Sequence, residues 1–306
     1  MMKRENQAYL YAVGAVFLWS TVATAFKLTL RYMSPPQLLL FASLVSCVVL
    51  LAILAAQKKL GTVLAQKQKD LLWSAGLGLL NPFFYYLVLF EAYNRLDAQL
   101  AQPLNYTWAV TLAFLSVPLL KQRLRPVDLA GALISYLGVI VLCARSTGFS
   151  FHFPDAIGVL LALGSTVLWS LYWIYNTRDK RDPVLALFTN FTFGTTYILL
   201  AALIWDVPLS APYQGFLGAA YVGVFEMGVA FFLWLKAMKL AESTVKVSTL
   251  IFFSPFLSLV FISFLLGERI YPSTFIGLPL IIAGVLLQRL NKSKSVSPNK
   301  PVSTQT

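Results

Sequence analysis

The stretch GFLGAAYVGVFEMGVAFFLWL, residues 215–235, is apolar along its length except at Glu226. A helix needs about 20 apolar residues to cross a bilayer, so this stretch predicts a transmembrane helix with one acidic side chain near its middle. An isolated carboxylate at the centre of a bilayer costs about 3 kcal/mol. A residue kept at that cost faces a protein interior or a water-filled pathway, and Glu226 is therefore the first candidate site residue.

Apolar runs of the same kind occupy most of the chain. Of its 306 residues, 58% are hydrophobic and only 12% are charged, whereas soluble domains carry roughly 25% charged residues. The runs leave no stretch long enough for a separate soluble domain, so the predicted fold class is all-α integral membrane, with ten transmembrane helices. The ten runs are Tyr9–Phe26, Pro36–Ala56, Leu71–Tyr93, Ala98–Leu120, Leu129–Ala144, Ala156–Tyr175, Val184–Ile204, Gln214–Met238, Val245–Leu266 and Ser273–Leu287.

The net charge of +12 is a topology signal. If alternate loops lie on opposite sides of the membrane, 19 of the 24 basic residues fall on the side of the N-terminus. Acidic residues divide almost evenly, six and five, with Glu226 inside the membrane. The positive-inside rule makes the basic side cytoplasmic. This removes a nucleic-acid interpretation and predicts a multi-pass protein of the plasma membrane (the inner membrane of bacteria) with both termini in the cytoplasm.

The residues that hold metals or cofactors are scarce. Cys47 and Cys143 lie inside apolar runs, and the single histidine, His152, falls in an outer loop. Metal chemistry needs clustered His, Cys or carboxylate ligands. We therefore expect no metal site, no cofactor and no catalytic residues.

The chain contains an internal repeat. Leu18-Trp19-Ser20 returns as Leu168-Trp169-Ser170 at an offset of 150, and Asp97 matches Glu242 at an offset of 145. Further pairs at an offset of 146 are Arg123 with Arg269, Pro126 with Pro272, Gly131 with Gly277, and Gly138 with Gly284. These pairs divide the chain into two five-helix repeats, residues 8–145 and 155–290, followed by a tail, 291–306, that we expect to be disordered and cytoplasmic. Because five is odd, the second repeat enters the membrane inverted, as in many secondary transporters.

These residues carry a family resemblance. Leu18-Trp19-Ser20, Val167-Leu168-Trp169-Ser170 and Leu266-Gly267-Glu268-Arg269, with Gly277 and Gly284 after them, resemble the drug/metabolite transporter superfamily, specifically its EamA type. The resemblance implies a ten-helix inner-membrane carrier, often an exporter of amino acids or other small metabolites, with helices 1, 3, 4, 6, 8 and 9 around a central cavity. The first half departs from the pattern, with Leu120-Lys121-Gln122-Arg123 in place of Leu-Gly-Glu-Arg.

Two polar groups are predicted at a similar depth in the membrane. At the offset of 145, Glu226 in helix 8 corresponds to Asn81 in helix 3, and Asn81 is followed by Pro82, which bends a helix. Asn81 could line the cavity or make an interhelical hydrogen bond. Low dielectric favours a neutral carboxyl, so Glu226 could be a protonated structural residue, a proton carrier or a partner for a substrate ammonium.

Further candidates lie on helices 1, 4 and 6. Gln102 and Tyr106 share one face of helix 4 with Gln99, and Asn105 lies beside it; a polar face on a lipid-embedded helix must turn inward. On helices 1 and 6, aromatic residues could form a lining for an apolar or cationic substrate, although core packing is the alternative for each of them. The candidates on these two helices are Trp19, Ser20, Trp169, Ser170 and Tyr172.

The predicted function is a secondary transporter of small metabolites that alternates access around a midplane cavity containing Glu226. No Gly-rich loop ending in Gly-Lys-Ser/Thr occurs, so ATP drive by this chain is unsupported, and no enzyme motif appears. The alternative is a flippase of lipid-linked or amphipathic substrates. The expected partners are a small-molecule substrate and membrane lipid, and a homodimer is left open.

Overall fold

The computed structural model is helical over almost all of the residues it describes: 4–121, 126–143, 145–147, 150–152, 155–176, 178–241, 247 and 250–293. Among these residues, eight helical spans are long and apolar enough to cross a membrane, and two shorter apolar helices cover Leu250–Leu266 and Pro272–Leu287. The chain is a multi-pass membrane protein. Glu242, Arg123 and residues 294–306, which belong to the predicted repeat and tail, lie outside the described residues.

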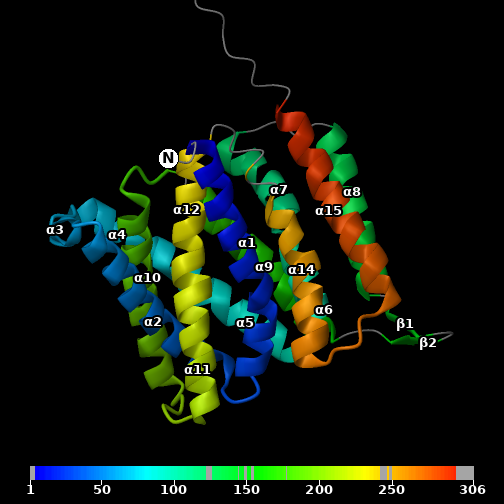
Figure 1. Cartoon of the computed structure of the whole chain (residues 1–306), viewed down its shortest axis with the longest axis horizontal. Helices are drawn as coiled ribbons and strands as arrows, with labels where there is room; N and C mark the ends of the chain where they lie inside the picture. Colours follow the sequence, from blue (N-terminus) through cyan, green and yellow to red (C-terminus); the bar gives the residue numbers. More distant parts are fainter. Residues whose placement is uncertain are drawn as a thin grey trace, which may run out of the picture.

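The helices run up and down a single bundle (Figure 1). The first part of the chain contains α1 (Arg4–Thr29), α2 (Pro35–Ala56), α3 (Leu60–Leu64), α4 (Gln68–Gly78), η1 (Leu79–Phe84), α5 (Tyr85–Arg95), α6 (Ala98–Tyr106), α7 (Trp108–Leu120) and α8 (Pro126–Cys143). The second part contains α9 (Ala156–Asn176), α10 (Pro183–Ile204), α11 (Tyr213–Tyr221), η2 (Val222–Ala230), α12 (Phe231–Leu240), η3 (Leu250–Phe253), α14 (Ser254–Phe261), η4 (Ile262–Leu266) and α15 (Pro272–Ser293). Between them, β1 (Arg145–Thr147) and β2 (Ser150–His152) form a short antiparallel hairpin.

Several spans are broken at identifiable residues. In the third span, Asn81 has φ −147° and ψ 119°, outside the helical region, and Pro82 follows without an N–H to donate. The bend predicted at Pro82 is therefore confirmed. The eighth span passes through η2, which contains Glu226. This segment is a π-helix, whose turns are wider than those of an α-helix, and we call it the wide-turn segment. Such segments are frequent at functional sites.

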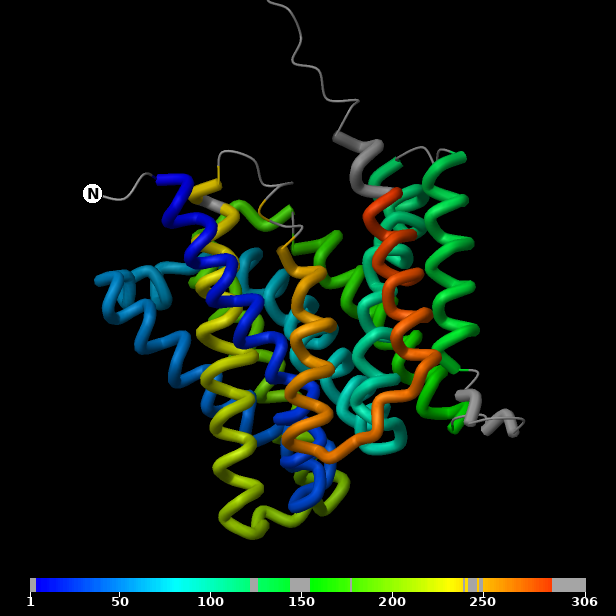
Figure 2. The backbone as a smooth tube through the Cα atoms, turned by 45° about the vertical axis from the view of Figure 1, so that its right-hand side comes forward, coloured from blue at the N-terminus to red at the C-terminus, as the bar shows by residue number. Residues whose placement is uncertain are grey.

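The pair α8 and α15 lies side by side at one flank of the bundle (Figures 1 and 2). Glycines allow the two backbones to touch. A Cβ on Gly138 would lie 2.6 Å from the Gly277 carbonyl oxygen, and one on Gly277 would lie 2.7 Å from that of Gly138. Gly284 meets Gly131 in the same way. The glycines that the repeat matched in sequence thus pair crosswise between the helices, which is the close approach expected of small residues.

The remaining helices enclose the centre of the molecule. The first helix, α1, packs against α12, η2 and α14, whereas α9 packs against α5 and α7, and α10 packs against α2 and α4. Their shared core contains large, fully buried side chains, among them Phe26, Tyr86 and Phe90. This arrangement leaves the interface between α1, α9, η2 and α6 as the place where a central site can form.

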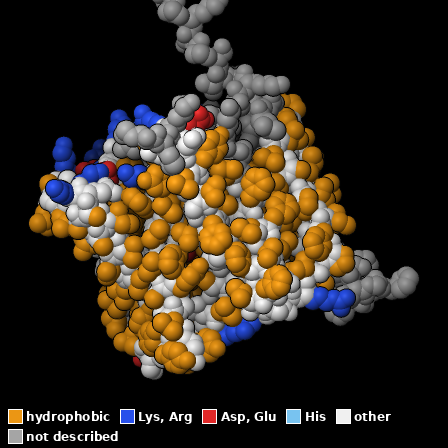
Figure 3. Space-filling model, in the orientation of Figure 1, with side chains coloured by type: hydrophobic (Ala, Val, Ile, Leu, Met, Phe, Trp, Pro, Cys, Tyr) orange, Lys and Arg blue, Asp and Glu red, His pale blue; other side chains and the backbone are white. Residues whose placement is uncertain are grey.

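The outer surface is apolar around the flank. Figure 3 shows hydrophobic side chains across the middle of one face, with Lys and Arg gathered towards its edges. Leu133 and Ile140 on α8 are 68% and 64% exposed, which is the pattern of a lipid-facing helix. The start of α1 and the end of α15 lie at the same end of the bundle, called here the N-terminal end (Figure 1). The other end, where α1 finishes, is called the distal end.

Candidate substrate cavity

A cavity of about 550 Å³ lies in the centre of the bundle. The six helices that the family resemblance placed around it each contribute side chains: α1, α5, α6 with α7, α9, η2 with α12, and η3. Its lining continues to Leu120 and Met238, in the last turns of α7 and α12 at the N-terminal end. Towards the distal end it stops at Phe26 and Tyr93, whose rings meet edge to face at 5.3 Å.

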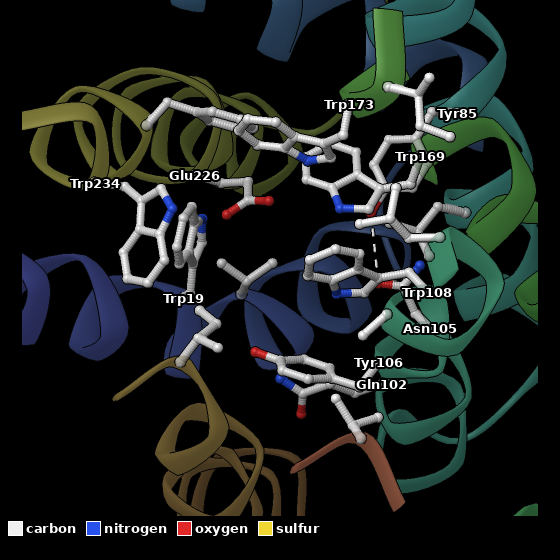
Figure 4. Close-up of a pocket in the computed structure, with 18 of the residues that line it drawn as sticks. Trp19, Tyr85, Gln102, Asn105, Tyr106, Trp108, Trp169, Trp173, Glu226 and Trp234 are labelled. Atoms are coloured by element: carbon white, nitrogen blue, oxygen red, sulfur yellow. Dashed lines mark hydrogen bonds between the residues drawn. The ribbon is translucent and has the colours of Figure 1, made fainter. Parts of the chain in front are cut away.

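Glu226 projects from η2 into this cavity (Figure 4). Its Oε1 accepts a hydrogen bond from the Tyr86 hydroxyl at 3.2 Å, and the Trp19 indole lies beside the carboxyl. Its Oε2 is buried and has no hydrogen-bond partner among the described residues. A buried carboxyl oxygen without a partner is costly unless another group satisfies it. The protein therefore provides a hydrogen bond to Oε1 of Glu226, and Oε2 is left to bind a proton or a ligand.

Aromatic rings form two walls around that carboxyl (Figure 4). On one side, Trp19 packs against Trp234 with ring centroids 5.3 Å apart. On the other, Tyr85 stacks on Trp169 at 4.5 Å with an interplanar angle of 29°. The indole of Trp108 also faces the space. The site therefore offers several ring faces within one cavity.

Neutral polar groups on α6 form a third side. Gln102 and Tyr106 line the cavity, as their shared helical face predicts, and so does Asn105 beside them. Gln99, predicted on the same face, lies outside the lining, and its Nε2 donates to the Arg269 carbonyl at 2.9 Å. Asn105 is held in place, because its Nδ2 donates to Ser165 Oγ at 2.9 Å and its Oδ1 accepts from the Tyr85 hydroxyl at 3.4 Å. These side chains can orient a ligand, and none of them carries a charge.

Six of the ten predicted site residues thus come together in the cavity, and four lie outside its lining. The six are Glu226, Gln102, Asn105, Tyr106, Trp19 and Trp169. Ser20 donates to the Phe17 carbonyl of its own helix at 2.5 Å, and Ser170 donates to the Trp108 carbonyl at 3.0 Å. Tyr172 is buried and accepts a hydrogen bond from Asn190 Nδ2 at 3.4 Å.

Asn81 is the fourth residue outside the lining. It is fully buried, and neither of its amide atoms has a hydrogen-bond partner among the described residues. The segment around it packs on α10: Pro82 lies against Gly194, and Gly78 lies against the Asn190 carbonyl. Asn81 therefore occupies the interface between η1 and α10 and does not face Glu226 across the cavity.

Some lining residues gave no signal in the sequence. Tyr85 lines the cavity, and Tyr86, which is outside the lining, donates to Glu226; both follow the break at Pro82 and were not distinguished from the many aromatic residues of the apolar runs. Trp234 lies eight residues after Glu226, about two helical turns, and this spacing could have placed it on the same face. Trp173 also lines the cavity, and its indole nitrogen is buried without a partner.

Polar contacts close the distal end below the cavity. Lys27 Nζ, at the end of α1, donates to the carbonyl oxygens of Tyr93 and Leu96, both at 2.9 Å. Glu268, in the loop before α15, accepts from the backbone N–H groups of Ala98 and Gln99 at 2.9 and 3.3 Å, and so caps α6. These contacts join α1, α5, α6 and the last loop, and we call them the distal closure.

Known proteins share this fold and sequence pattern. Residues 6–144 and 156–289 each match the EamA-like transporter family. A solved crystal structure matches with a TM-score of 0.66 and 25% identity, covering 96% of this chain and 100% of that one.

Two bacterial relatives illustrate what this chain is similar to. A protein of Ancylobacter novellus named aromatic amino acid exporter YddG is 31% identical over 76% of this chain and 80% of its own length. The uncharacterized transporter YvbV of Bacillus subtilis is 28% identical over 92% of this chain and 90% of its own length.

Proposed function

This chain belongs to the EamA-like transporter family, and from that premise we propose that it is a secondary carrier that exports small organic molecules, amino acids or related compounds. The family and the named relatives are transporters, not enzymes. The observation that carries the proposal is the Glu226 carboxyl, which sits in an enclosed aromatic cavity with one oxygen unpartnered. The exporter direction is supported by the printed name of the Ancylobacter relative.

We propose ten transmembrane helices arranged as two inverted five-helix repeats. Eight full spans and two shorter apolar helices make up that number among the described residues. The family matches the chain twice, once in each half. The crosswise pairing of Gly131 and Gly138 with Gly284 and Gly277 also supports a two-fold relation between the halves.

The carrier works by alternating access. In this structure the cavity lining reaches the N-terminal end, and the distal closure blocks the other end. The excess of basic residues at the N-terminal end supports placing that end in the cytoplasm of a bacterial cell. The observed state therefore corresponds to one that loads substrate from inside, and export requires the distal closure to open while the N-terminal end closes.

Glu226 couples this cycle to a gradient. A carboxyl in a low-dielectric cavity must be neutralised, either by a proton or by a cationic group of the substrate. One carboxyl cannot be neutralised by both at once, so a proton that enters from outside releases the substrate, and a substrate that enters from inside releases the proton. Tyr85, Tyr86, Tyr93 and Tyr106 all interact electrostatically with Glu226. No other Asp or Glu lies among the described residues that line the cavity, so Glu226 is the sole carboxyl there.

Transport by proteoliposomes tests the proposal. Purified protein would be reconstituted, loaded with labelled amino acids and amines, and assayed with and without an imposed pH gradient. We expect flux that the gradient accelerates and that Glu226→Gln abolishes, whereas Glu91→Gln, which alters an acid paired with Arg95 near the surface, should retain it. The coupling role would be refuted if, for every compound carried, neither the pH gradient nor Glu226→Gln changed the flux. A parallel assay with lipid-linked sugars separates the carrier from a flippase.

A further inference from the structure

The central cavity contains an acidic side chain and no basic side chain among the described residues that line it. Glu226 is the acidic residue, and no Lys, Arg or His lies among these described residues. The other polar groups of the lining are neutral, and they include the amides of Gln102 and Asn105. The polar lining therefore contains one anion and no cation to balance a negative ligand.

This imbalance determines which ligand charge the cavity tolerates. A charge taken from water into a protein interior is costly unless it is paired there. An ammonium beside the ionised Glu226 leaves the cavity neutral. A zwitterion leaves one uncompensated negative charge, and an anion adds its charge to that of the carboxylate. Amide donors can bond a carboxylate but cannot neutralise it.

The aromatic walls favour the same ligand. Cations are attracted to the faces of Trp and Tyr rings within about 6 Å, and the attraction increases when water is excluded. Trp19 and Trp234 stand on one side of Glu226, while Tyr85 and Trp169 stand on the other (Figure 4). A cation bonded to the free Oε2 of Glu226 would thus have ring faces around it. The volume of about 550 Å³ is ample for a single aromatic or aliphatic body of metabolite size.

We infer that the cavity binds its substrate as an organic monocation, an amine or quaternary ammonium on an aromatic or apolar body that lacks a free carboxylate. The inference rests on the proposed carrier function and narrows its substrate class. Within amino acids and related compounds, it selects amines, esters and amides over the free zwitterions. The carboxylate of Glu226 supplies the charge, the rings supply the enclosure, and the amides of α6 supply orientation.

Three probes that share one phenyl group and differ in charge test the inference: 2-phenylethylamine, phenylalanine and 3-phenylpropionate. Binding to the purified full chain would be measured calorimetrically near pH 7. We expect the amine to bind at least about tenfold more tightly than phenylalanine, and the anion to bind least. Glu226→Gln should weaken amine binding by roughly tenfold or more, Glu226→Asp should retain part of it, and Glu91→Gln should leave it unchanged.

Phenyltrimethylammonium keeps the test informative if Glu226→Gln fails to fold, because this cation donates no hydrogen bond and probes the charge of the wild-type site alone. Its competition with 2-phenylethylamine is the expected result. The inference is overturned if phenylalanine binds as tightly as the amine, if a folded Glu226→Gln protein binds the amine normally, or if none of the probes binds.

Flux measurements separate this inference from the proposed function. If the amine binds selectively but no compound crosses the proteoliposome membrane, the carrier function fails and the charge selectivity stands. If phenylalanine is carried as readily as the amine, the carrier function stands and the charge selectivity is overturned.

Discussion

The hydroxyl of Tyr86 donates a hydrogen bond of 3.2 Å to Oε1 of Glu226, which joins two residues 140 positions apart in the chain. Tyr86 lies on α5, just after the break at Asn81, and Glu226 lies in the wide-turn segment η2. The two irregular segments belong to the third and eighth spans, which the proposed repeat makes equivalent. Tyr86, just after the break in one span, thus supplies the hydrogen-bond donor, and Glu226, in the wide-turn segment of the other span, supplies the carboxyl that accepts.

Removal of that donor should impair transport without unfolding the protein. A hydrogen bond to a charged group is worth about 1.5–3 kcal/mol, so Tyr86→Phe should slow gradient-driven flux by roughly 10- to 100-fold. The ring is retained, and the core contacts with Phe90 persist. Proteoliposome efflux measures the effect, with Tyr136→Phe as a control because Tyr136 is 40% exposed on α8. Equal rates for the two variants would contradict a role for the Tyr86 hydroxyl.

The contact between α8 and α15 should be sensitive to a single methyl group. A Cβ on Gly138 would lie 2.6 Å from the Gly277 carbonyl oxygen and 2.8 Å from the Ile281 nitrogen, so backbone would have to move. Gly138→Ala should therefore destabilise the protein by about 1–3 kcal/mol, the usual cost of overpacking.

The matched control for Gly138 is Gly164 on α9, where a Cβ would meet nothing within 4 Å. Gly164→Ala should be neutral or stabilising by up to about 1 kcal/mol, because alanine favours helix. Thermal unfolding in detergent compares the two. A melting temperature lowered equally by both changes would show that the close approach of the two helices at Gly138 does not control the result.

At the N-terminal end, a buried ion pair should make stability depend on pH. Asp179 and Arg181 lie in the loop between α9 and α10, with their side chains 6% and 11% exposed. Burial opposes ionisation of Asp179, but its hydrogen bonds and charge interaction with Arg181 outweigh this and lower its pKa. A lowered carboxyl pKa contributes stability that is present above the unfolded value and lost as pH falls through the folded one.

Asp179→Asn should therefore cost about 2 kcal/mol at pH 7, and the gap from wild type should shrink as the pH falls below about 4. Arg181 would keep its bonds to Gln66 Oε1 and Ser74 Oγ, both at 2.7 Å, which limits the damage. Unfolding curves of both proteins between pH 3 and 7 test this. A gap that stays constant with pH would assign the loss to packing.

Hydropathy alone predicted the spans, because lipid requires each of them to be long and apolar. The inward face of α6 was also predictable, since Gln102, Asn105 and Tyr106 could not face lipid. The short hairpin β1–β2 was not predicted, because the loop that contains it carries no alternating pattern long enough to indicate strands.

Local structure explains why some candidate residues lie outside the cavity lining. Alignment of the repeats predicted how deep Asn81 lies in the membrane. The non-helical φ and ψ at this residue take it out of helical register, so the direction of its side chain could not be predicted from its depth. Ser20 satisfies its hydroxyl on its own helix, which a sequence cannot distinguish from a ligand contact. Tyr86 was not identified because an aromatic residue in an apolar run indicates core packing and nothing more.

Release of the distal closure should expose the cavity from outside. Lys27 holds the carbonyl oxygens of Tyr93 and Leu96, and Lys27→Met removes both bonds. Loss of charge-assisted bonds worth about 1.5–3 kcal/mol should raise the population that is open at the distal end roughly 10- to 100-fold. In a chain without Cys47 and Cys143, a cysteine introduced at Gln102 in the cavity lining reports this opening through its labelling by an impermeant maleimide.

The control for Lys27 is Lys59→Met, which removes a lysine of the opposite end, where Lys59 pairs with Asp182 at 2.6 Å. In right-side-out vesicles, Lys27→Met should accelerate labelling from outside, and Lys59→Met should not. Acceleration by both variants would indicate general loosening of the bundle, and acceleration by neither would show that the distal closure does not gate the cavity. Thermal unfolding distinguishes the first result from a gate, because loosening lowers the melting temperature of both variants, whereas opening of a gate changes access in the Lys27 variant alone.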